Sequence, residues 1–252
     1  MTGDIADEMF ANYVAALARI AELGPGAEGA EVGPFRVMEA GVENPLFNVV
    51  VATARASGTD IAAVEGWYRA RDAGFRVVVR EPVDRELIGL LRARGYTPRE
   101  REPGMLLEQL PASMAPAPGL DIERVHDLPG ALDYADAEPG DDGRDVRAAI
   151  SRAALALPGC AMLLGRAGGL PVARSMGLVT GEMVGVYNVY VRPEYRRRGF
   201  GEALTAAALL AGAEQGAKRA TLSATELGYP VYERMGFKTL FDFVSYWPPS
   251  AG

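Results

Sequence analysis

Residues 188–222 read NVYVRPEYRRRGFGEALTAAALLAGAEQGAKRATL, and no other part of the chain has so definite a pattern. An apolar run ends at Arg192, and Pro193 breaks it because proline cannot donate a main-chain hydrogen bond to a neighbouring strand. The loop 193–201 is rich in arginine and contains two glycines, and it leads into a helical pattern that Gly216 ends. The segment therefore predicts a strand, a glycine loop and a helix in direct succession.

The strand before this loop, at residues 183–192, is apolar on both faces, which is typical of a strand in the middle of a sheet. Upstream, Gly168-Gly169 separates two strand-like runs and predicts a hairpin. The whole half predicts an α/β fold in which helices cover a mixed sheet. We expect strands at 120–125, 161–166, 171–180, 183–192, 219–225 and 241–247, and helices at 128–135, 144–157, 202–215 and 230–234.

The first 110 residues show a similar alternation of strands and helices. The run PASMAPAPG at 111–119 has three prolines and no charge, and it predicts an extended linker. We therefore expect one domain at 1–110, a linker at 111–118 and a second domain at 119–252. In the first domain, helices are expected at 4–23, 60–72 and 84–94, and strands at 35–38, 46–53, 75–80 and 105–110.

Composition excludes several classes of function. The net charge is -7, whereas nucleic-acid binders carry a broad basic face. With one cysteine, Cys160, and one histidine, His126, we expect no intramolecular disulfide and no metal site. The N-terminus is acidic where a signal peptide would be basic, and no segment has the apolar length of a membrane span. We therefore expect a cytoplasmic protein with no membrane contact.

The loop and the helix after it have the chemistry of an anion site. Gly199 and Gly201 allow unusual dihedrals and close approach of a ligand to the backbone. The first N–H groups of the helix have no internal partner, and the helix dipole adds partial positive charge there. Arg196, Arg197 and Arg198 add further positive charge at the same place. Taken alone, R-x-x-G-x-G is a weak signal, equally compatible with a tight turn flanked by solvated arginines, because a P-loop lysine and a Rossmann spacing are both absent.

A second motif downstream changes this interpretation. Arg196-Arg197-Arg198-Gly199-Phe200-Gly201 resembles the R/Q-x-x-G-x-G/A loop of the GCN5-related N-acetyltransferase (GNAT) superfamily. The nine residues YPVYERMGF at 229–237 resemble the late Y-x-x-x-G-F signature of the same superfamily, at the expected separation. The resemblance covers about residues 120–247.

The resemblance implies acetyl-CoA as co-substrate. Loop amides from Arg197 to Glu202 would bind the CoA diphosphate, and the main chain of Val189 and Val191 would pair with the pantetheine arm. A backbone N–H near Val189 would stabilise the oxyanion of the acetyl group. The expected cofactor-binding residues are Val189, Tyr190, Val191, Arg196, Arg197, Arg198, Gly199, Phe200, Gly201, Glu202, Thr225 and Tyr229.

The catalytic residue that the resemblance implies is Tyr232, as general acid for the departing CoA thiolate. A phenol has an unperturbed pKa of ~10, so it is protonated at neutral pH and can donate to sulfur. The alternative is that Tyr232 only packs against its neighbours. No general base is evident, because the strand 183–191 has Asn188 but no interior carboxylate, and Glu182 comes too early. Deprotonation through water, or a protein that only binds acyl-CoA, therefore stays open.

An acidic run lies between the first two helices of the second half. It would attract a cationic acceptor, or it is simply a solvated loop. Its members are Asp133, Asp136, Glu138, Asp141 and Asp142.

The first half resembles a degenerate copy of the same fold, as in tandem members of the superfamily. Arg55-Ala56-Ser57-Gly58 is a poor substitute for the arginine-rich loop, so we do not expect this half to bind CoA. It would shape the acceptor site or mediate dimerisation.

The sequence therefore predicts an N-acetyltransferase that moves acetyl from acetyl-CoA to a primary amine of a small molecule, by direct attack in a ternary complex. The alternatives are a non-catalytic acyl-CoA-binding regulatory module, transfer of another acyl group, and transfer to a protein amine.

Overall fold

The computed structural model describes residues 2–21, 23, 26–41, 47–115, 117–140 and 144–249. The chain forms two compact units, each assembled from separate parts of the sequence. The larger unit comprises Met1–Ala16 and Met105–Lys238, and the smaller unit comprises Leu17–Gly104 and Thr239–Gly252. Several residues of the predicted features lie outside the described residues: Glu22, Leu46, Pro116, Asp141 and Asp142.

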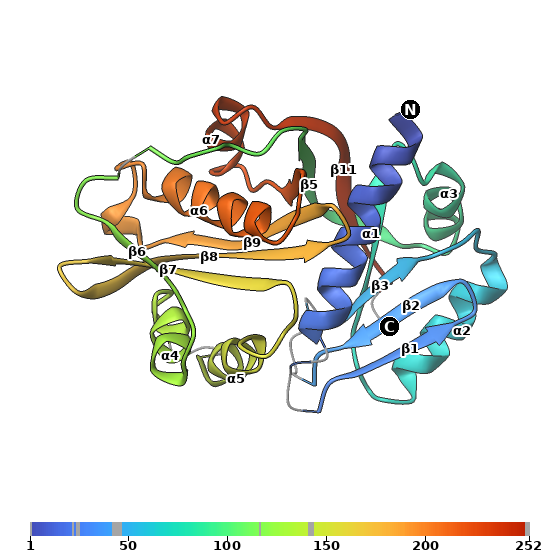
Figure 1. Cartoon of the computed structure of the whole chain (residues 1–252). Coiled ribbons are helices and arrows are strands. Elements are labelled where there is room, and N and C mark those ends of the chain that lie inside the picture. The colour runs from blue at the N-terminus through green and yellow to red at the C-terminus, as the bar shows by residue number, and fades with distance from the viewer. Residues whose placement is uncertain are drawn as a thin grey trace. The chain divides into compact units, whose positions relative to one another are not determined.

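The larger unit is a mixed sheet with helices on both faces, which confirms the predicted α/β class. Its strand order is β5-β10-β9-β8-β7-β6. Strands β6 to β9 pair antiparallel, whereas β10 pairs parallel with β9. Figure 1 shows α6 on one side of these strands and α4 and α5 on the other. The elements are β6 (Asp121–Arg124), α4 (Leu128–Asp136), α5 (Arg144–Ala154), β7 (Cys160–Ala167), β8 (Leu170–Thr180), β9 (Met183–Val191), α6 (Phe200–Glu214), β10 (Arg219–Ser223) and α7 (Tyr229–Arg234), with the first residues of α1 (Thr2–Ala21) and the end of β5 (Thr97–Leu107).

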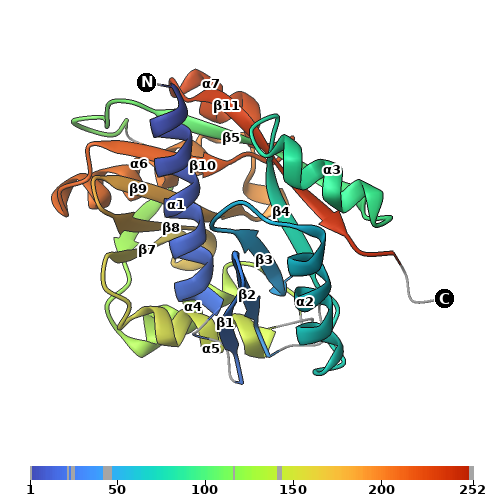
Figure 2. The ribbon, with the colours of Figure 1, turned by 90° about the vertical axis from the view of Figure 1, so that its right-hand side faces the viewer.

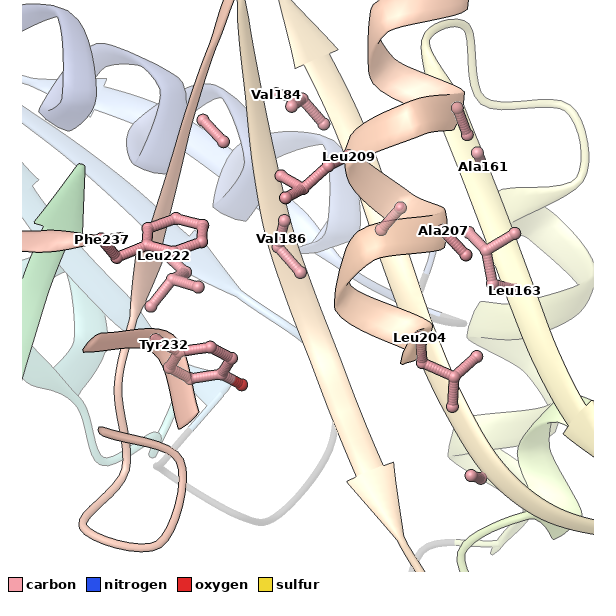
Figure 3. Packing of buried hydrophobic residues seen from close by; sticks show 14 of the residues in the cluster. Ala161, Leu163, Val184, Val186, Leu204, Ala207, Leu209, Leu222, Tyr232 and Phe237 are labelled. Atoms are coloured by element: carbon pink, nitrogen blue, oxygen red, sulfur yellow. The ribbon is translucent and has the colours of Figure 1, made fainter. Parts of the chain in front are cut away.

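Helix α6 is the centre of the larger unit's core. It is apolar on nearly all sides, as expected of a helix enclosed by its neighbours. Leu204, Leu209 and several alanines pack on β7–β10, as Figure 3 shows. A Cβ at Gly212 would lie 2.6 Å from a side-chain carbon of Val184, so this glycine lets α6 approach β9 closely. This packing fixes the start of α6 beside the end of β9.

The smaller unit has its own sheet and core. Its strand order is β1-β2-β3-β4-β11-β5, with β3 and β4 parallel. Helices α2 and α3 bury Ile61, Tyr68 and Leu91 against the sheet, and Figure 2 gives a view of this unit. The elements are β1 (Glu28–Val32), β2 (Phe35–Glu39), β3 (Val49–Ala52), α2 (Gly58–Arg69), β4 (Arg76–Glu81), α3 (Arg85–Ala93), β5 and β11 (Lys238–Trp247).

Both units repeat one order of elements. In the smaller unit an antiparallel meander (β1, β2, β3) leads through α2 to the parallel strand β4, then through α3 to β5. In the second repeat the meander β7, β8, β9 leads through α6 to the parallel strand β10, then through α7 to β11. The predicted duplication is therefore present in the topology, although the two copies differ in sequence.

The compact units are not continuous in sequence, because β11 of the second repeat lies in the smaller unit and the end of β5 lies in the larger one. Strand β11 ends the second repeat but pairs antiparallel with β4, from Asp242↔Glu81 to Tyr246↔Val77. Strand β5 ends the first repeat, yet it lies next to β10, and Met105 belongs to the core around α6. The smaller unit therefore contains a strand of the second repeat, whereas the larger unit contains only Met105–Leu107 of β5. In the segment between the repeats, Met114 and Ala117 pack against the core of the larger unit.

Candidate active site

The two central parallel strands separate soon after they pair. The register of β9 and β10 runs from Arg219↔Met183 to Thr221↔Gly185, whereas β9 continues to Val191. Figure 3 shows Val186 of β9 and Leu222 of β10 on strands that diverge toward Tyr232. The second half of β9 therefore has an edge that β10 does not cover.

The end of β9 directs main-chain groups to this open edge. The N–H of Arg192 donates to the carbonyl oxygen of Val172 on the β8 side, at 2.9 Å. Because successive residues of a strand alternate in direction, Val191 and Val189 direct their N–H and carbonyl groups to the opposite edge. There the Val191 carbonyl accepts a hydrogen bond from Arg196 Nε at 3.0 Å. An extended ligand can pair with this edge as an added strand.

A β-bulge lies just before these residues. Arg174 faces Tyr190 and Met176 faces Tyr187, so β9 has one more residue than β8 in this interval. Asn188 takes up the bulge with a φ of 53°, in the left-handed region that asparagine tolerates better than other side chains. The bulge turns β9 at the point where its edge becomes open.

We expect Asn188→Val to lower the free energy of unfolding by about 1–2 kcal/mol, since a β-branched residue is strained at this dihedral. Turnover should fall as well, because Val189 would be displaced. Asn188→Gly should keep both near their native values, since glycine adopts this conformation freely. Urea denaturation measures the first effect. Equal stability of the valine and glycine variants would show that the bulge does not need the left-handed residue.

The loop and the start of α6 form a cradle of main-chain amides. Gly199 is the N-cap of α6 with a φ of 79°, and no side chain caps the helix. Arg197 also has a positive φ of 60°. The first helical bond runs from Ala203 N–H to the Gly199 carbonyl oxygen at 3.0 Å, so the N–H groups before Ala203 are at the open end of the helix. Within the described residues, no carboxylate forms an ion pair with Arg196, Arg197 or Arg198. This arrangement suits a phosphate or diphosphate.

A pocket of about 800 Å³ connects the open edge of β9, the amide cradle and α7. We call it the main pocket. It brings together all but two of the site residues predicted from the sequence; Arg198 and Tyr229 do not line it. It also contains Leu227, Gly228, Val231 and Arg234, which were not predicted. Its full lining is Val189, Tyr190, Val191, Arg196, Arg197, Gly199, Phe200, Gly201, Glu202, Thr225, Leu227, Gly228, Val231, Tyr232 and Arg234.

Tyr232 is held at the base of the diverging strands. Its side chain is 8% exposed, and its ring meets that of Phe237 edge to face, with centroids 6.0 Å apart. A Cβ at Gly228 would lie 2.7 Å from Tyr232 Cε2, so only glycine leaves room for the ring here. Figure 3 shows the hydroxyl oxygen turned toward β9. Tyr232 therefore combines a packed ring with a hydroxyl at the pocket.

The acidic run of the second half carries little uncompensated charge where the structure describes it. Asp133 pairs with Arg166 at 2.6 Å and Asp136 pairs with Arg144 at 2.8 Å. Glu138 forms an ion pair with Arg174, whose side chain is buried. The hydrogen bond from Arg144 holds the pKa of Asp136 below its usual range. These pairs favour the structural interpretation of the run over attraction of a cationic acceptor.

The face of β9 opposite α6 has a buried amide instead of a carboxylate. Asn12 of α1 donates to Thr180 Oγ1 at 2.6 Å and accepts from the Tyr187 hydroxyl at 2.8 Å. A Cβ at Gly185 would lie 2.3 Å from Asn12 Oδ1, so the amide occupies the space beside this glycine. Glu182 forms an ion pair with Lys218, which lowers the pKa of this carboxyl. Glu182 is therefore a salt-bridge partner rather than an evident base.

Cys160 is a mostly buried thiol, and burial raises its pKa to about 11. At pH 8 only about one thiol in a thousand would be the reactive thiolate. We expect alkylation by iodoacetamide to be slow at pH 8 and to accelerate as the pH approaches 11. Denatured protein should react near the ordinary pKa of a thiol and serves as the control. Fast labelling of the folded chain at pH 8 would contradict this burial.

Within the described part of the chain, no cluster of histidine, cysteine, aspartate and glutamate has the composition of a metal site. A helix of sufficient length and apolarity to cross a membrane is likewise absent from the described residues.

Residues 158–239 match the family model of an acetyltransferase (GNAT) domain. This part of the chain is therefore similar to a GNAT domain. No curated protein sequence matches the chain.

Solved structures extend the likeness to both units. A GCN5-related N-acetyltransferase from Kribbella flavida is 20% identical, with 93% of this chain and 96% of that chain covered and a TM-score of 0.70. A tandem GNAT protein from the clavulanic acid biosynthesis pathway is 16% identical, with 95% and 94% covered and a TM-score of 0.64. At these identities the likeness establishes the fold alone, over nearly the whole length of the chain.

Proposed function

We propose that this chain is an acetyl-CoA-dependent N-acetyltransferase whose acceptor is a primary amine of a small molecule. The observation that carries the proposal is the main pocket, which joins an uncapped helix N-terminus, an open strand edge and Tyr232. A diphosphate, an amide-containing arm and a thioester have that order in acetyl-CoA. A cytoplasmic location, where acetyl-CoA is supplied, fits the proposal.

Electrostatic attraction of the diphosphate would be the first contribution to acetyl-CoA binding. The amides at the start of α6, with Arg196 and Arg197, would hold the diphosphate. The pantetheine amides would pair with Val189 and Val191, and the thioester would lie where β9 and β10 diverge. Holding thioester and amine together removes most of the entropic cost of their encounter.

The chemistry would be a direct transfer. The amine nitrogen forms a bond to the carbonyl carbon of the thioester, and the carbonyl oxygen becomes an oxyanion that the Val189 N–H stabilises. When the carbon–sulfur bond breaks, the sulfur leaves as thiolate and takes the proton of the Tyr232 hydroxyl. The proton of the attacking amine passes to water, and the Tyr232 hydroxyl is later reprotonated from water.

The competing function is an acyl-CoA-binding module without catalysis. It is favoured by one observation, the amide of Asn12 in place of a carboxylate beside β9. One experiment distinguishes the transferase from the binding module. The chain is incubated with acetyl-CoA and a panel of amines, and the free CoA is measured with a thiol reagent. Amine-dependent release of CoA supports transfer. Tight CoA binding with no release for any amine class would favour the binding module.

The smaller unit has no comparable cradle at its corresponding helix. The N-terminus of α2 is closed by its own side chains, since Ser57 accepts from the Asp60 N–H and Asp60 accepts from the Ser57 N–H at 2.8 Å. This capping box satisfies the amides that a diphosphate would need. Arg55, in the loop before α2, pairs with Glu86 at 2.9 Å.

We therefore expect one CoA to bind per chain in a calorimetric titration. The smaller unit would contribute no second site. A fitted stoichiometry of two would contradict this reading of the α2 cap.

A further inference from the structure

The arginine that follows β9 directs its side chain to α4 and not into the main pocket. The Arg192 guanidinium donates to two carbonyl oxygens at the C-terminal end of α4: Nε donates to Ala137 at 3.1 Å, and Nη2 donates to Asp136 at 2.9 Å. The last carbonyl groups of a helix have no partner within the helix, and the helix dipole makes this end negative. A positively charged donor therefore stabilises this end, and Arg192 connects the end of β9 to α4.

The part of β9 just before Arg192 has a neighbouring strand on one side only. Residues 189–191 lie beyond the pairs that β9 forms with β10. On the other side, β8 pairs with Val191 and accepts a hydrogen bond from the Arg192 N–H. A strand edge without a neighbour leaves half of its main-chain groups unpaired. The two side-chain bonds of Arg192 therefore add a restraint to a segment that lacks one from β10.

This segment contains the main-chain groups that pair with the pantetheine arm in the proposed complex. An added strand binds well only when its partner strand already has the right position, because ordering that strand on binding would cost affinity. Arg192 lies next to Val191, so a change in how its side chain is held would move the pairing groups directly.

We propose that Arg192 is a positioning residue for the pantetheine arm, and that its bonds to the end of α4 fix the direction of the Val189 and Val191 main-chain groups. The proposal rests on the proposed function, in which these groups pair with the amides of the arm. Arg192 acts through the strand and does not contact the ligand. The end of α4 thereby takes part in co-substrate binding from the face of the sheet opposite α6.

Two ligands separate the arm from the diphosphate. CoA has both parts, whereas adenosine 3′-phosphate 5′-diphosphate has no arm. Arg192→Met keeps a long side chain and removes the guanidinium. It should raise the calorimetric Kd of CoA about tenfold and leave that of the nucleotide within about twofold, because α6 is held by its own core packing. Arg192→Lys keeps a charged donor, so its Kd for CoA should lie between those of the native chain and the methionine variant.

Arg166→Met is the matched control. Arg166 of β7 binds the same helix through the Asp133 carboxylate at 2.6 Å and also pairs with Glu123 at 2.8 Å. This variant should lose stability in urea denaturation and bind CoA like the native chain.

Three results would overturn the proposal. The first is native CoA affinity in Arg192→Met, and the second is an equal loss of CoA affinity in Arg166→Met. The third is an equal loss for CoA and the nucleotide in Arg192→Met, which would place the effect in the loop before α6 and not in β9. If the native chain bound neither ligand, the proposed function itself would fail. That result differs from native CoA affinity in the Arg192→Met variant.

Discussion

Tyr232→Phe should lower the turnover of acetyl transfer by about two to three orders of magnitude, which is the usual contribution of a positioned general acid. The dissociation constant for acetyl-CoA should stay within about twofold of the native value, because the phenyl ring keeps its packing against Phe237. The loss would appear in kcat, since the hydroxyl acts only when the thiolate leaves. Single-turnover kinetics with a saturating amine measure this step directly.

The control is the loss of a buried tyrosine hydroxyl elsewhere. Tyr96 is buried in the smaller unit, and its hydroxyl donates to Glu65 Oε1 at 3.1 Å. Tyr96→Phe should cost stability without affecting the transfer step. If Tyr232→Phe kept full turnover, Tyr232 would be a packing residue and another group would protonate the thiolate.

Gly199→Val should weaken CoA binding about a hundredfold. With a φ of 79°, Gly199 sets the direction of the first amides of α6, and valine would leave this region of dihedral space. Its side chain would also occupy space next to the diphosphate. The free energy of unfolding should fall by only about 1–2 kcal/mol, so the variant should remain folded.

Gly169 provides a matched control. It has a φ of 82° in the β7–β8 turn, and a Cβ there would meet nothing within 4 Å, as at Gly199. Gly169→Val should therefore lose similar stability and bind CoA normally. Calorimetry on both variants separates strain from binding. Equal CoA affinities in the two variants would show that the α6 amides do not bind CoA.

Sequence patterning predicted the elements that are buried on both faces. Strand β9 and helix α6 agree with prediction to within one or two residues, because their apolar runs are long and proline and glycine mark their ends. Strand β1 was not predicted, since its residues are mostly exposed and show no apolar alternation. Strand β5 begins at Thr97, eight residues before its predicted start, for a similar reason: its first residues are largely exposed and charged.

The pairing of β11 with β4 of the first repeat could not be predicted from these patterns. Alternation in β5 and β11 indicates which side chains face a core, but it does not identify the neighbouring strand. For the same reason a continuous domain boundary near residue 111 was the natural prediction.

The candidate site was largely predictable because its ligand groups are mostly main-chain atoms of one loop. Gly228 lies four residues before Tyr232 and could have been found from helical spacing. The motif spacing gave no indication of Leu227 and Arg234 in the main pocket.

In the proposed complex, the main-chain amides at the start of α6 hold the diphosphate of CoA. A crystal structure of the chain with CoA tests it most directly. We expect diphosphate oxygens within about 3 Å of backbone nitrogens between Gly199 and Glu202, a normal hydrogen-bond distance. Density for the diphosphate at any other part of the chain would contradict it.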